Sequence, residues 1–393
     1  MIIGEIFTAS VERLVSGGAG LLHYQGQSIF MDNTAPGDTV IGRIREDHKG
    51  WAWADPVEIT EASPNRISPA CPLYETCGGC SLQHLSYEAQ LTEKSALLQD
   101  TLIRIGGLRV LPKLKVYPAP PFEYRNRVQF HRISRPRHGA AALGFRQRKG
   151  EEVIPLEDCP VADPGIRQAL RTKRLFPPPE KDRFTVYARG KTFLSENGTR
   201  RGTVSLLNRE LLMDAGVFFQ SNGTMLEKVI TDLITLTETA DNSLPMADLY
   251  CGVGTFASFL QDRFYRMDLV EQNKTALALA RENAGNAGIR YAALPGDQWV
   301  KTLAEKALLH YSFIVADPPR QGLSPLLRRR LSHAGPPLLA YLSCNPATLA
   351  RDTQELTRGG YVLEELRFYD FYPQTAHIES LAVFRRKGNG HVC

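Results

Sequence analysis

The stretch Met246-Ala247-Asp248-Leu249-Tyr250-Cys251-Gly252-Val253-Gly254-Thr255-Phe256 decides the fold of the second half of the chain. Its apolar run at 246–250 predicts a buried strand, the glycines at 252 and 254 predict a tight turn, and residues 256–261 begin a helix. The same alternation continues in apolar runs at 265–270, 313–316 and 338–342 and in an amphipathic helix at 273–287. Strands that alternate with helices predict a doubly wound parallel sheet.

The glycine turn also predicts a nucleoside cofactor. Gly252 and Gly254 allow the backbone to approach a ligand closely after the first strand. Glu271 lies 19 residues past Gly252, at the end of the second strand, where an acid can accept hydrogen bonds from two ribose hydroxyls. The third glycine of the dinucleotide fingerprint is absent, so the pattern suits S-adenosylmethionine better than NAD.

A single cysteine, Cys344, follows the apolar strand at 338–342. Asn345-Pro346 then breaks the strand, and a helix can begin at Ala347. Ligands and chemistry lie at the carboxyl ends of the strands in open parallel sheets, so Cys344 is a candidate nucleophile. The alternative is a buried cysteine that only packs, as most free cysteines do.

Residues 1–60 predict a small all-β barrel, because short strands alternate with frequent turns. The segment resembles the TRAM domain, an OB-like barrel appended to RNA-modifying enzymes, and the matching stretches are 17–20, 28–31 and 35–40. Acids outnumber bases in it, which is the reverse of a phosphate-binding surface. Either Arg43, Arg45 and Lys49 form a local basic patch, or the barrel adds little affinity for RNA.

Cysteines cluster after a linker at 63–65. Cys71, Cys77 and Cys80 lie within ten residues, and Cys159 is the best candidate for a fourth ligand. Thiolates are the preferred ligands of zinc and of iron–sulfur centres, so this set predicts a metal site. Ligand type alone leaves both metals open, although zinc sites usually have two close Cys-x-x-Cys pairs.

The strongest basic run of the chain lies between Tyr124 and Gly150, which contains no acid before Glu151. Its bases are Arg125, Arg127, Arg132, Arg135, Arg137, Arg146, Arg148 and Lys149. Tyr124, Phe130 and Phe145 lie among these basic residues. Basic side chains interleaved with aromatic ones suit a surface that binds single-stranded nucleic acid. The alternative is an ordinary charged face.

Length and composition predict a multidomain globular protein. The 393 residues carry a net charge of +5, and no apolar run reaches the length of a membrane span. The first residues lack a secretory pattern, so we expect a cytoplasmic protein. We also expect it to be a monomer. We expect three domains, at 1–60, 61–215 and 216–393, with a helix at 86–105 that packs on the third.

The chain resembles the RNA (uracil-5-)-methyltransferases, and specifically their Fe–S-containing 23S rRNA branch. The matching motifs are the four cysteines above, 248–256, Asp317-Pro318-Pro319-Arg320-Gln321-Gly322, Ser343-Cys344-Asn345-Pro346 and His377-Ile378-Glu379-Ser380. The resemblance implies an α/β fold: a Rossmann-like methyltransferase domain, an N-terminal TRAM barrel and a central β-rich Fe–S domain.

The resemblance also implies roles for individual residues. Cys344 would be the nucleophile and Glu379 the general base of C5-methylation of a 23S rRNA uridine. Contacts to S-adenosylmethionine would come from Gln220, Tyr250, Glu271 and Asp317, and a [4Fe–4S] cluster would be held by Cys71, Cys77, Cys80 and Cys159. The target uridine would be unpaired or flipped, because a paired uracil exposes neither ring face. Two alternatives are the same reaction on the T-loop uridine of tRNA and a non-catalytic Fe–S RNA-binding protein.

Overall fold

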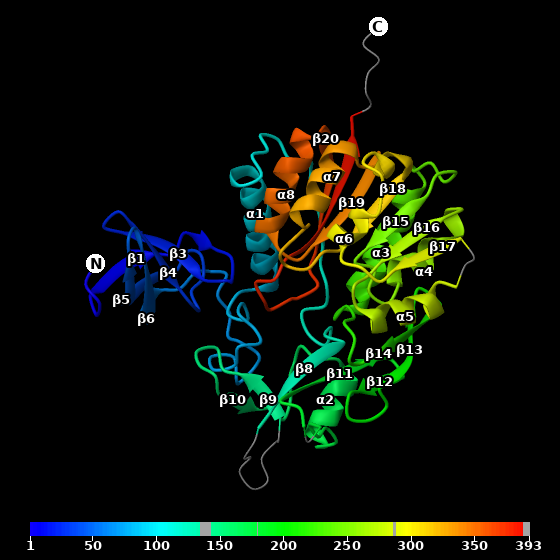
Figure 1. Ribbon diagram of the computed structural model, residues 1–393. Coiled ribbons are helices and arrows are strands. Elements are labelled where there is room, and N and C mark those ends of the chain that lie inside the picture. Colours follow the sequence, from blue (N-terminus) through cyan, green and yellow to red (C-terminus); the bar gives the residue numbers. More distant parts are fainter. Residues whose placement is uncertain (134–142, 179, 286–287, 388–393) are drawn as a thin grey trace.

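Four β-sheets of six, five, two and eight strands make up the computed structural model, which describes residues 1–133, 143–178, 180–285 and 288–387. Figure 1 shows the N-terminal six-stranded sheet at one side, the five-stranded sheet below, and the eight-stranded sheet with its helices above. None of the helices in these ranges is long and apolar enough to cross a membrane.

The eight-stranded sheet has the strand order β17-β16-β15-β18-β19-β21-β20-β7. Its first five strands are parallel. They are β15 (Met246–Leu249), β16 (Met267–Val270), β17 (Ile289–Ala292), β18 (Phe313–Ala316) and β19 (Leu338–Ser343). Four of these strands match predicted apolar runs, because strands covered on both faces need continuous apolar sequence.

The other edge of this sheet differs from the prediction of a doubly wound parallel sheet, which was wrong there. β21 (Glu379–Arg386) runs antiparallel to both β19 and β20 (Tyr361–Tyr369), and β7 (Leu114–Tyr117) joins the edge beside β20. Only residues 370–378 connect β20 to β21. Such a connection is too short for the crossover that parallel strands require, so the sheet is mixed.

Helices cover both faces of the sheet. One face carries α3 (Gly223–Thr237), α4 (Thr255–Leu260) and α5 (Lys274–Asn283). The other face carries α1 (Tyr87–Arg104), α6 (Gly296–Lys301), α7 (Pro325–Ala334) and α8 (Pro346–Arg358). Leu98 and Leu102 of α1 are fully buried in the same core as Leu349 of α8, so this early helix packs on the sheet formed by the end of the chain.

Capping residues set the ends of these helices. The Ser86 side chain accepts a hydrogen bond from the Ala89 amide, and α1 begins there as predicted. α5 ends at Asn283, earlier than the predicted 287, and residues 286–287 lie outside the described ranges. The short 3-10 helices are η1 (Gln261–Arg263) and η2 (Ala307–His310).

The N-terminal sheet has the strand order β1-β5-β6-β4-β3-β2. Its strands are β1 (Ile6–Ser10), β2 (Arg13–Leu14), β3 (Gly20–Tyr24), β4 (Gln27–Met31), β5 (Thr39–His48) and β6 (Trp51–Glu61). The sheet curls so that its strands β1 and β3, which are not neighbours in it, come into contact. Phe7 on β1 stacks on Tyr24 of β3 with ring centroids 5.0 Å apart. Leu22, Ile29 and Val40 fill the core between its two ends.

The central part of the chain holds the five-stranded sheet and a hairpin. The sheet has the order β10 (Val153–Pro155), β9 (Leu143–Arg146), β8 (Arg127–Arg132), β11 (Arg183–Arg189) and β12 (Thr192–Ser195), and the hairpin pairs β13 (Arg201–Leu206) with β14 (Arg209–Asp214). α2 (Pro164–Arg171) packs on β11, with Ile166 fully buried.

Candidate active site

The turn between β15 and α4 has a left-handed backbone at three of five positions: Tyr250 (φ 64°), Gly252 (φ 56°) and Gly254 (φ 78°). A Cβ added to Gly254 would lie 2.9 Å from the Cβ of Ala280 on α5, so this glycine permits close helix packing. A Cβ added to Gly252 would meet none of the described atoms within 4 Å. The backbone at Gly252 is therefore open to a ligand.

Glu271 lies against this turn at the end of β16. Its Oε2 accepts a hydrogen bond from the Gly252 amide at 3.1 Å, and its Oε1 accepts one from the Asn273 amide at 2.7 Å. These two bonds orient the carboxylate beside the open backbone. The position fits the predicted ribose contact.

A buried carboxyl group beneath the turn was not among the predicted site residues. Asp248 is fully buried in β15, and neither of its carboxyl oxygens has a hydrogen-bond partner among the described residues. Burial raises its pKa well above the usual value, and the negative charges of Asp317 and Glu271 raise it further. The available signal was an acid inside an otherwise apolar strand.

Gln220 and Asp317 meet at the carboxyl end of β18. Gln220 Nε2 donates a hydrogen bond to Asp317 Oδ2 at 3.2 Å, and the Asp317 amide donates to the Leu249 carbonyl at 3.2 Å. Burial raises the Asp317 pKa to about 7, although the Gln220 bond lowers it. The structure therefore brings together two predicted cofactor contacts that are 97 residues apart.

The side chain of Tyr250 points to another neighbour. A Cβ added to Gly296 on α6 would lie 3.2 Å from the Tyr250 hydroxyl. Burial and the nearby Asp297 raise the Tyr250 pKa to about 12. This predicted cofactor residue thus faces α6, which covers the face of the sheet opposite to α4.

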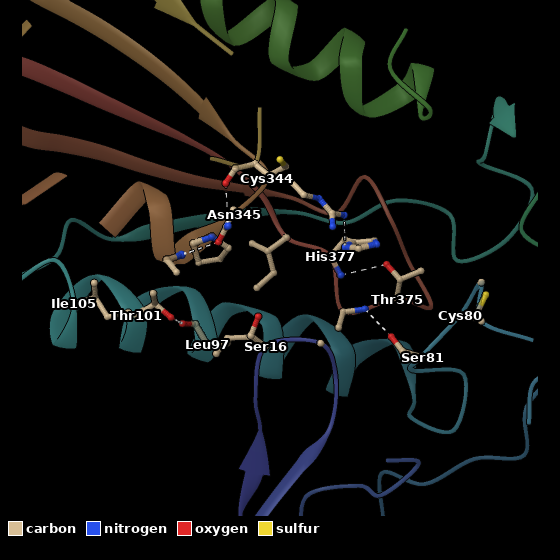
Figure 2. Close-up of a pocket in the computed structure, with 18 residues that line it drawn as sticks. Ser16, Cys80, Ser81, Leu97, Thr101, Ile105, Cys344, Asn345, Thr375 and His377 are labelled. Carbon is tan, nitrogen blue, oxygen red and sulfur yellow. Dashed lines mark hydrogen bonds between the residues drawn. The ribbon is translucent and has the colours of Figure 1, made fainter. Parts of the chain in front are cut away.

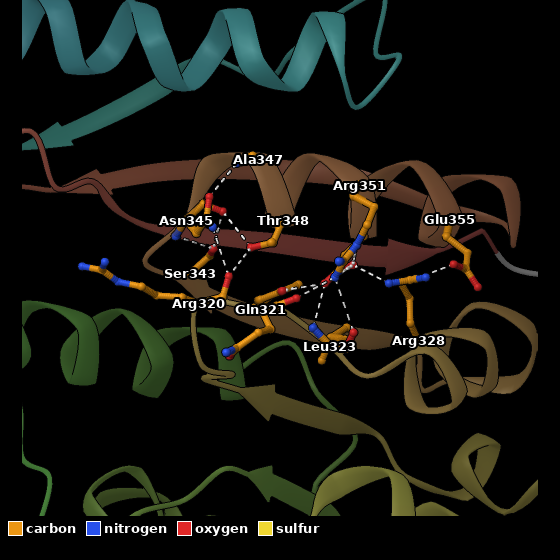
Figure 3. Close-up of polar contacts among 12 residues, drawn as sticks. Arg320, Gln321, Leu323, Arg328, Ser343, Asn345, Ala347, Thr348, Arg351 and Glu355 are labelled. Atoms are coloured by element: carbon orange, nitrogen blue, oxygen red, sulfur yellow. Dashed lines mark hydrogen bonds and ion pairs between the residues drawn. The ribbon is translucent and has the colours of Figure 1, made fainter. Parts of the chain in front are cut away.

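Cys344 is half-buried and directly follows Ser343, the last residue of β19. Figure 3 shows how the turn at Asn345 is tied to the loop at Arg320. The Asn345 amide donates to Ser343 Oγ at 3.2 Å, and Asn345 Oδ1 caps α8. Asn345 Nδ2 and Thr348 Oγ1 both donate to the Arg320 carbonyl, at 3.0 and 3.2 Å. The turn that presents the cysteine and the loop that presents Arg320 are therefore one unit.

Glu379 is the first residue of β21, where only 6% of it is exposed. Ser343 pairs with Ser380 in the antiparallel ladder of β19 and β21. Cys344 directly follows Ser343 and Glu379 directly precedes Ser380, so both lie at this end of the ladder, close enough for the charge of Glu379 to raise the pKa of Cys344. The sheet register thus brings the predicted nucleophile and the predicted base to the same end of two neighbouring strands.

The charges around this pair favour neutral groups. Burial raises the Cys344 pKa to about 12, and the negative charges of Glu379 and Asp317 contribute to the rise. Burial and Asp317 raise the Glu379 pKa well above its usual value. Arg320 opposes both shifts, so its guanidinium favours the anionic form of each reacting group.

A cleft of about 460 Å³ opens in front of Cys344 (Figure 2). Its walls come from six separate segments. They are the turn at Ser16-Gly17, the cysteine loop at 78–81, the α1 region at Leu97, Thr101 and Ile105, Arg320, and the loops at 344–347 and 375–378. Arg320 Nη2 lies 3.4 Å from His377 Nδ1 at its edge. Burial and nearby cations lower the His377 pKa to about 4, so this histidine is neutral.

The four predicted metal ligands line one pocket. Cys71, Cys77, Cys80 and Cys159 share it with Arg125 and Gln83. Burial raises the pKa of Cys77, that of Cys80 to about 11 and that of Cys159 to about 12. Within the described residues, no three His, Cys, Asp or Glu side chains form a group that could hold one metal ion.

The basic run divides between exposed and internal roles. The Arg127 guanidinium lies 5.6 Å from the centre of the Phe218 ring, which is 60% exposed two residues before Gln220. In contrast, Arg148 donates to the Tyr74 and Cys80 carbonyls, and Lys149 pairs with Asp55 of the N-terminal sheet. These last two bases hold the protein together. Arg135 and Arg137 lie outside the described residues.

Comparisons with known proteins identify relatives among the RNA methyltransferases. Residues 188–387 match the family model of the tRNA (uracil-5-)-methyltransferases. An uncharacterized RNA methyltransferase of Treponema denticola is 32% identical over 92% of this chain and 94% of its own length. A 23S rRNA (uracil(1939)-C(5))-methyltransferase of Alkalilimnicola ehrlichii is 28% identical, over 98% and 97% of the two chains.

A solved structure has the same fold. The tRNA (uracil-54, C5)-methyltransferase of Pyrococcus abyssi, in complex with S-adenosyl-L-homocysteine, superposes with a TM-score of 0.72 at 24% identity. The match covers 96% of this chain and 100% of that one. The family match spans about half of the chain and includes Cys344, Glu379 and every predicted cofactor residue, and it supports S-adenosylmethionine as the methyl donor. The chain belongs to the tRNA (uracil-5-)-methyltransferase family of RNA methyltransferases.

Proposed function

We propose that this protein methylates C5 of one uridine in 23S rRNA, with S-adenosylmethionine as the methyl donor. The observation that carries the proposal is that Cys344 and Glu379 flank the last pair of the β19 and β21 ladder, with Asp317 near both. The rRNA target is supported by relatives named 23S rRNA methyltransferases that align over 95–98% of this chain. A T-loop uridine of tRNA is the second candidate, favoured by the name of the matching family model.

The chemistry requires a thiolate and a base. Uracil C5 is too weak a nucleophile to attack a sulfonium methyl group by itself. When the Cys344 thiolate adds to C6, the electrons of the C5=C6 bond move toward O4 and make C5 an enolate carbon. C5 then takes the methyl group, Glu379 removes the C5 proton, and the re-formed double bond expels the thiolate. Arg320 is placed to favour both anions.

The chain's own residues fit the cofactor. S-adenosylmethionine supplies an electrophilic methyl group when it is bound. The open backbone at Gly252 and the oriented carboxylate of Glu271 suit its ribose, and the unpartnered oxygens of Asp248 suit a polar group beside the turn. Gln220 and Asp317 would complete the contact on the side of Cys344. Catalysis is then largely the positioning of three groups.

The exposed Phe218 ring beside Arg127 suits an unpaired RNA segment. Bases stack on exposed aromatic rings, and a guanidinium over the ring offers a charge for the phosphates. The pair of Phe218 and Arg127 lies at the Gln220 side of the site.

In this proposal, residues 1–60, 61–215 and 216–393 remain three domains of a cytoplasmic monomer.

The target RNA can be tested by mass mapping of 5-methyluridine in a deletion strain. We expect one 5-methyluridine to disappear from 23S rRNA and to return when the wild-type gene is restored. The tRNA of the same strain serves as the internal control, and its T-loop 5-methyluridine should stay. Loss of the modification from tRNA alone would instead identify tRNA as the substrate.

We further propose that Cys71, Cys77, Cys80 and Cys159 hold a [4Fe–4S] cluster. The four thiols line one pocket, and Arg125, which also lines it, has a buried Nε without a partner among the described residues. That cation would offset the charge of thiolates. Separate iron atoms bind separate thiolates in a cluster, so the four sulfurs need not converge on one ion, as zinc would require.

Metal removal tests this site. Anaerobically purified protein should be brown, with a broad absorbance band near the border of the visible and ultraviolet ranges and about four iron atoms per chain. Cys159→Ala should lose the band and the iron, because it removes one ligand. Cys251→Ala is the matched control, since Cys251 is buried in the core of the eight-stranded sheet. A colourless wild-type protein that contains zinc would contradict the cluster.

A further inference from the structure

The loop between β20 and β21, residues 370–378, ends at Glu379 and contains His377. At its centre lies Gln374, which is 4% exposed and has a left-handed backbone (φ 67°). A non-glycine residue keeps this conformation only where its surroundings hold it, and such residues concentrate at functional sites. The contacts that hold Gln374 therefore bear on the geometry of Glu379.

Two distant segments hold Gln374. Its carbonyl accepts hydrogen bonds from the amides of Ser81 and Leu82, both at 3.0 Å. Its side chain and its amide both bond to the buried side chain of Gln90: Gln90 Nε2 donates to Gln374 Oε1 at 2.9 Å, and the Gln374 amide donates to Gln90 Oε1 at 2.9 Å. Gln90 belongs to α1, and Ser81 directly follows Cys80.

Neighbouring contacts of the loop come from the same two segments and from Tyr124, which precedes β8. Lys94 of α1 donates to Asp370 Oδ1 at 2.8 Å and to the Tyr372 carbonyl at 3.0 Å. The Ala376 amide donates to Ser81 Oγ at 2.9 Å. The Tyr124 hydroxyl donates to the Pro373 carbonyl at 2.8 Å. The loop that leads into Glu379 is thus held by α1 and the cysteine loop.

We propose that Gln374 is a positioning residue for Glu379, and that through it α1 and the cysteine loop set the geometry of the catalytic base. The inference rests on the proposed role of Glu379 as the base. It gives the cysteine loop a part in the reaction without direct contact with the uracil. Ser81 and Gly78–Gly79 also line the cleft in front of Cys344, so one loop contributes to both features.

A displaced base should affect one step. Cys344 directly follows β19, and the pairing of Ser343 with Ser380 holds that strand independently of the loop. Addition of the thiolate to C6 and uptake of the methyl group by C5 therefore proceed. Removal of the C5 proton is slowed, so the double bond does not re-form and the thiolate is not expelled. Methylated RNA then remains covalently bound to the protein.

Two variants remove the side-chain bonds with little disturbance of the backbone. Gln374→Gly keeps the left-handed conformation, which glycine adopts freely, and keeps the carbonyl bonded to Ser81 and Leu82. Gln90→Leu removes the other partner with a side chain of similar size, and with it the hydrogen bonds from Gln90 Nε2 to the Leu82 and Leu85 carbonyls. Gln99→Leu, also on α1, is the matched control, because no polar contact joins Gln99 to the loop among the described residues.

We expect Gln374→Gly and Gln90→Leu each to slow turnover about tenfold to a hundredfold, since small misplacements of a reacting group have effects of this size. Each variant should also accumulate a denaturant-resistant protein–RNA adduct that carries the labelled methyl group. The double variant should be no slower than Gln90→Leu, because that change already removes the partner of the Gln374 side chain. Gln99→Leu should behave as the wild type.

The outcomes separate this inference from the proposed mechanism. If Glu379→Gln itself accumulates no adduct, the role of Glu379 fails and the inference fails with it. If Glu379→Gln accumulates the adduct, but Gln374→Gly and Gln90→Leu turn over at the wild-type rate or slow without an adduct, only the role of Gln374 is overturned. Adducts in both loop variants, with none in Gln99→Leu, support it.

Discussion

Cys344→Ala should abolish methyl transfer while the affinity for S-adenosylmethionine stays unchanged. The sulfur forms the bond to C6 that makes C5 reactive, and alanine offers no nucleophile in its place. Removal of a catalytic nucleophile typically costs about 10⁴-fold to 10⁶-fold in rate. The measurement is the transfer of a labelled methyl group to RNA, with cofactor affinity measured separately by calorimetry.

Two further variants sharpen this test. Cys344→Ser keeps a side chain of similar shape but has a much weaker nucleophile, so it should also be inactive. Cys251→Ala removes a cysteine within the cofactor turn whose side chain is buried in the core, so it measures the effect of a cysteine substitution at the turn without loss of the nucleophile. Full activity of Cys344→Ala would refute the covalent mechanism. Loss of cofactor affinity in Cys344→Ala would show instead that the substitution had disturbed the cofactor site.

Much of the α/β fold follows from local sequence. The apolar runs of β15, β18 and β19 lie within one residue of their predicted bounds, because strands inside a parallel sheet are buried on both faces. Ser86 and the glycines at 106–107 mark the ends of α1 through capping chemistry. These features depend on neighbours in sequence, which is why a single chain reveals them.

The edge of the sheet depends on distant contacts. β7 comes from residues before the central sheet, yet it pairs with β20 near the end of the chain. The apolar sequence of β21 is compatible with either strand direction, and the short loop before it makes the strand antiparallel. That reversal brings Glu379 and Cys344 to the same end of the β19 and β21 ladder, so the part of the sheet that differs from the prediction brings the two candidate reacting residues together.

In the candidate site too, features that depend on local sequence could be predicted, and features that depend on distant contacts could not. Motifs identified Cys344, Glu379 and Asp317, but the spacing of residues in sequence carried no information about their pairing. Asp248 and Gln374 were missed, because a carboxyl without partners and a reciprocal amide pair are visible only in three dimensions. The basic run was read as one surface, although Arg148 supports the cysteine loop from inside.

Glu379→Gln should convert the enzyme from one that releases RNA to one that keeps it. Glutamine has the shape of glutamate but does not accept the C5 proton, so the thiolate is not expelled after methyl transfer. We expect turnover to fall about 10²-fold to 10⁴-fold. A protein–RNA adduct with the labelled methyl group should accumulate on denaturing gels, at up to one RNA per protein chain.

The double variant Cys344→Ala/Glu379→Gln is the control for this adduct. It lacks the sulfur that binds C6, so it should form no covalent complex and transfer no methyl group. If Glu379→Gln turns over at the wild-type rate, another group removes the proton. If it is slow and also forms no adduct, Glu379 acts before methyl transfer, which contradicts its role as the final base.

A stability measurement excludes simple unfolding as the cause of the slow turnover. Burial holds the pKa of Glu379 well above its usual value of 4.5, so the folded protein binds a proton there that the unfolded chain releases as the pH rises above that value. The wild-type carboxyl therefore lowers the stability of the folded protein progressively above about pH 5.

The glutamine of Glu379→Gln does not titrate. The melting temperature of Glu379→Gln should thus rise relative to that of the wild type between pH 5 and pH 8, while its turnover stays low throughout. A variant that is more stable at neutral pH and yet fails to release RNA has lost a chemical group and kept its fold.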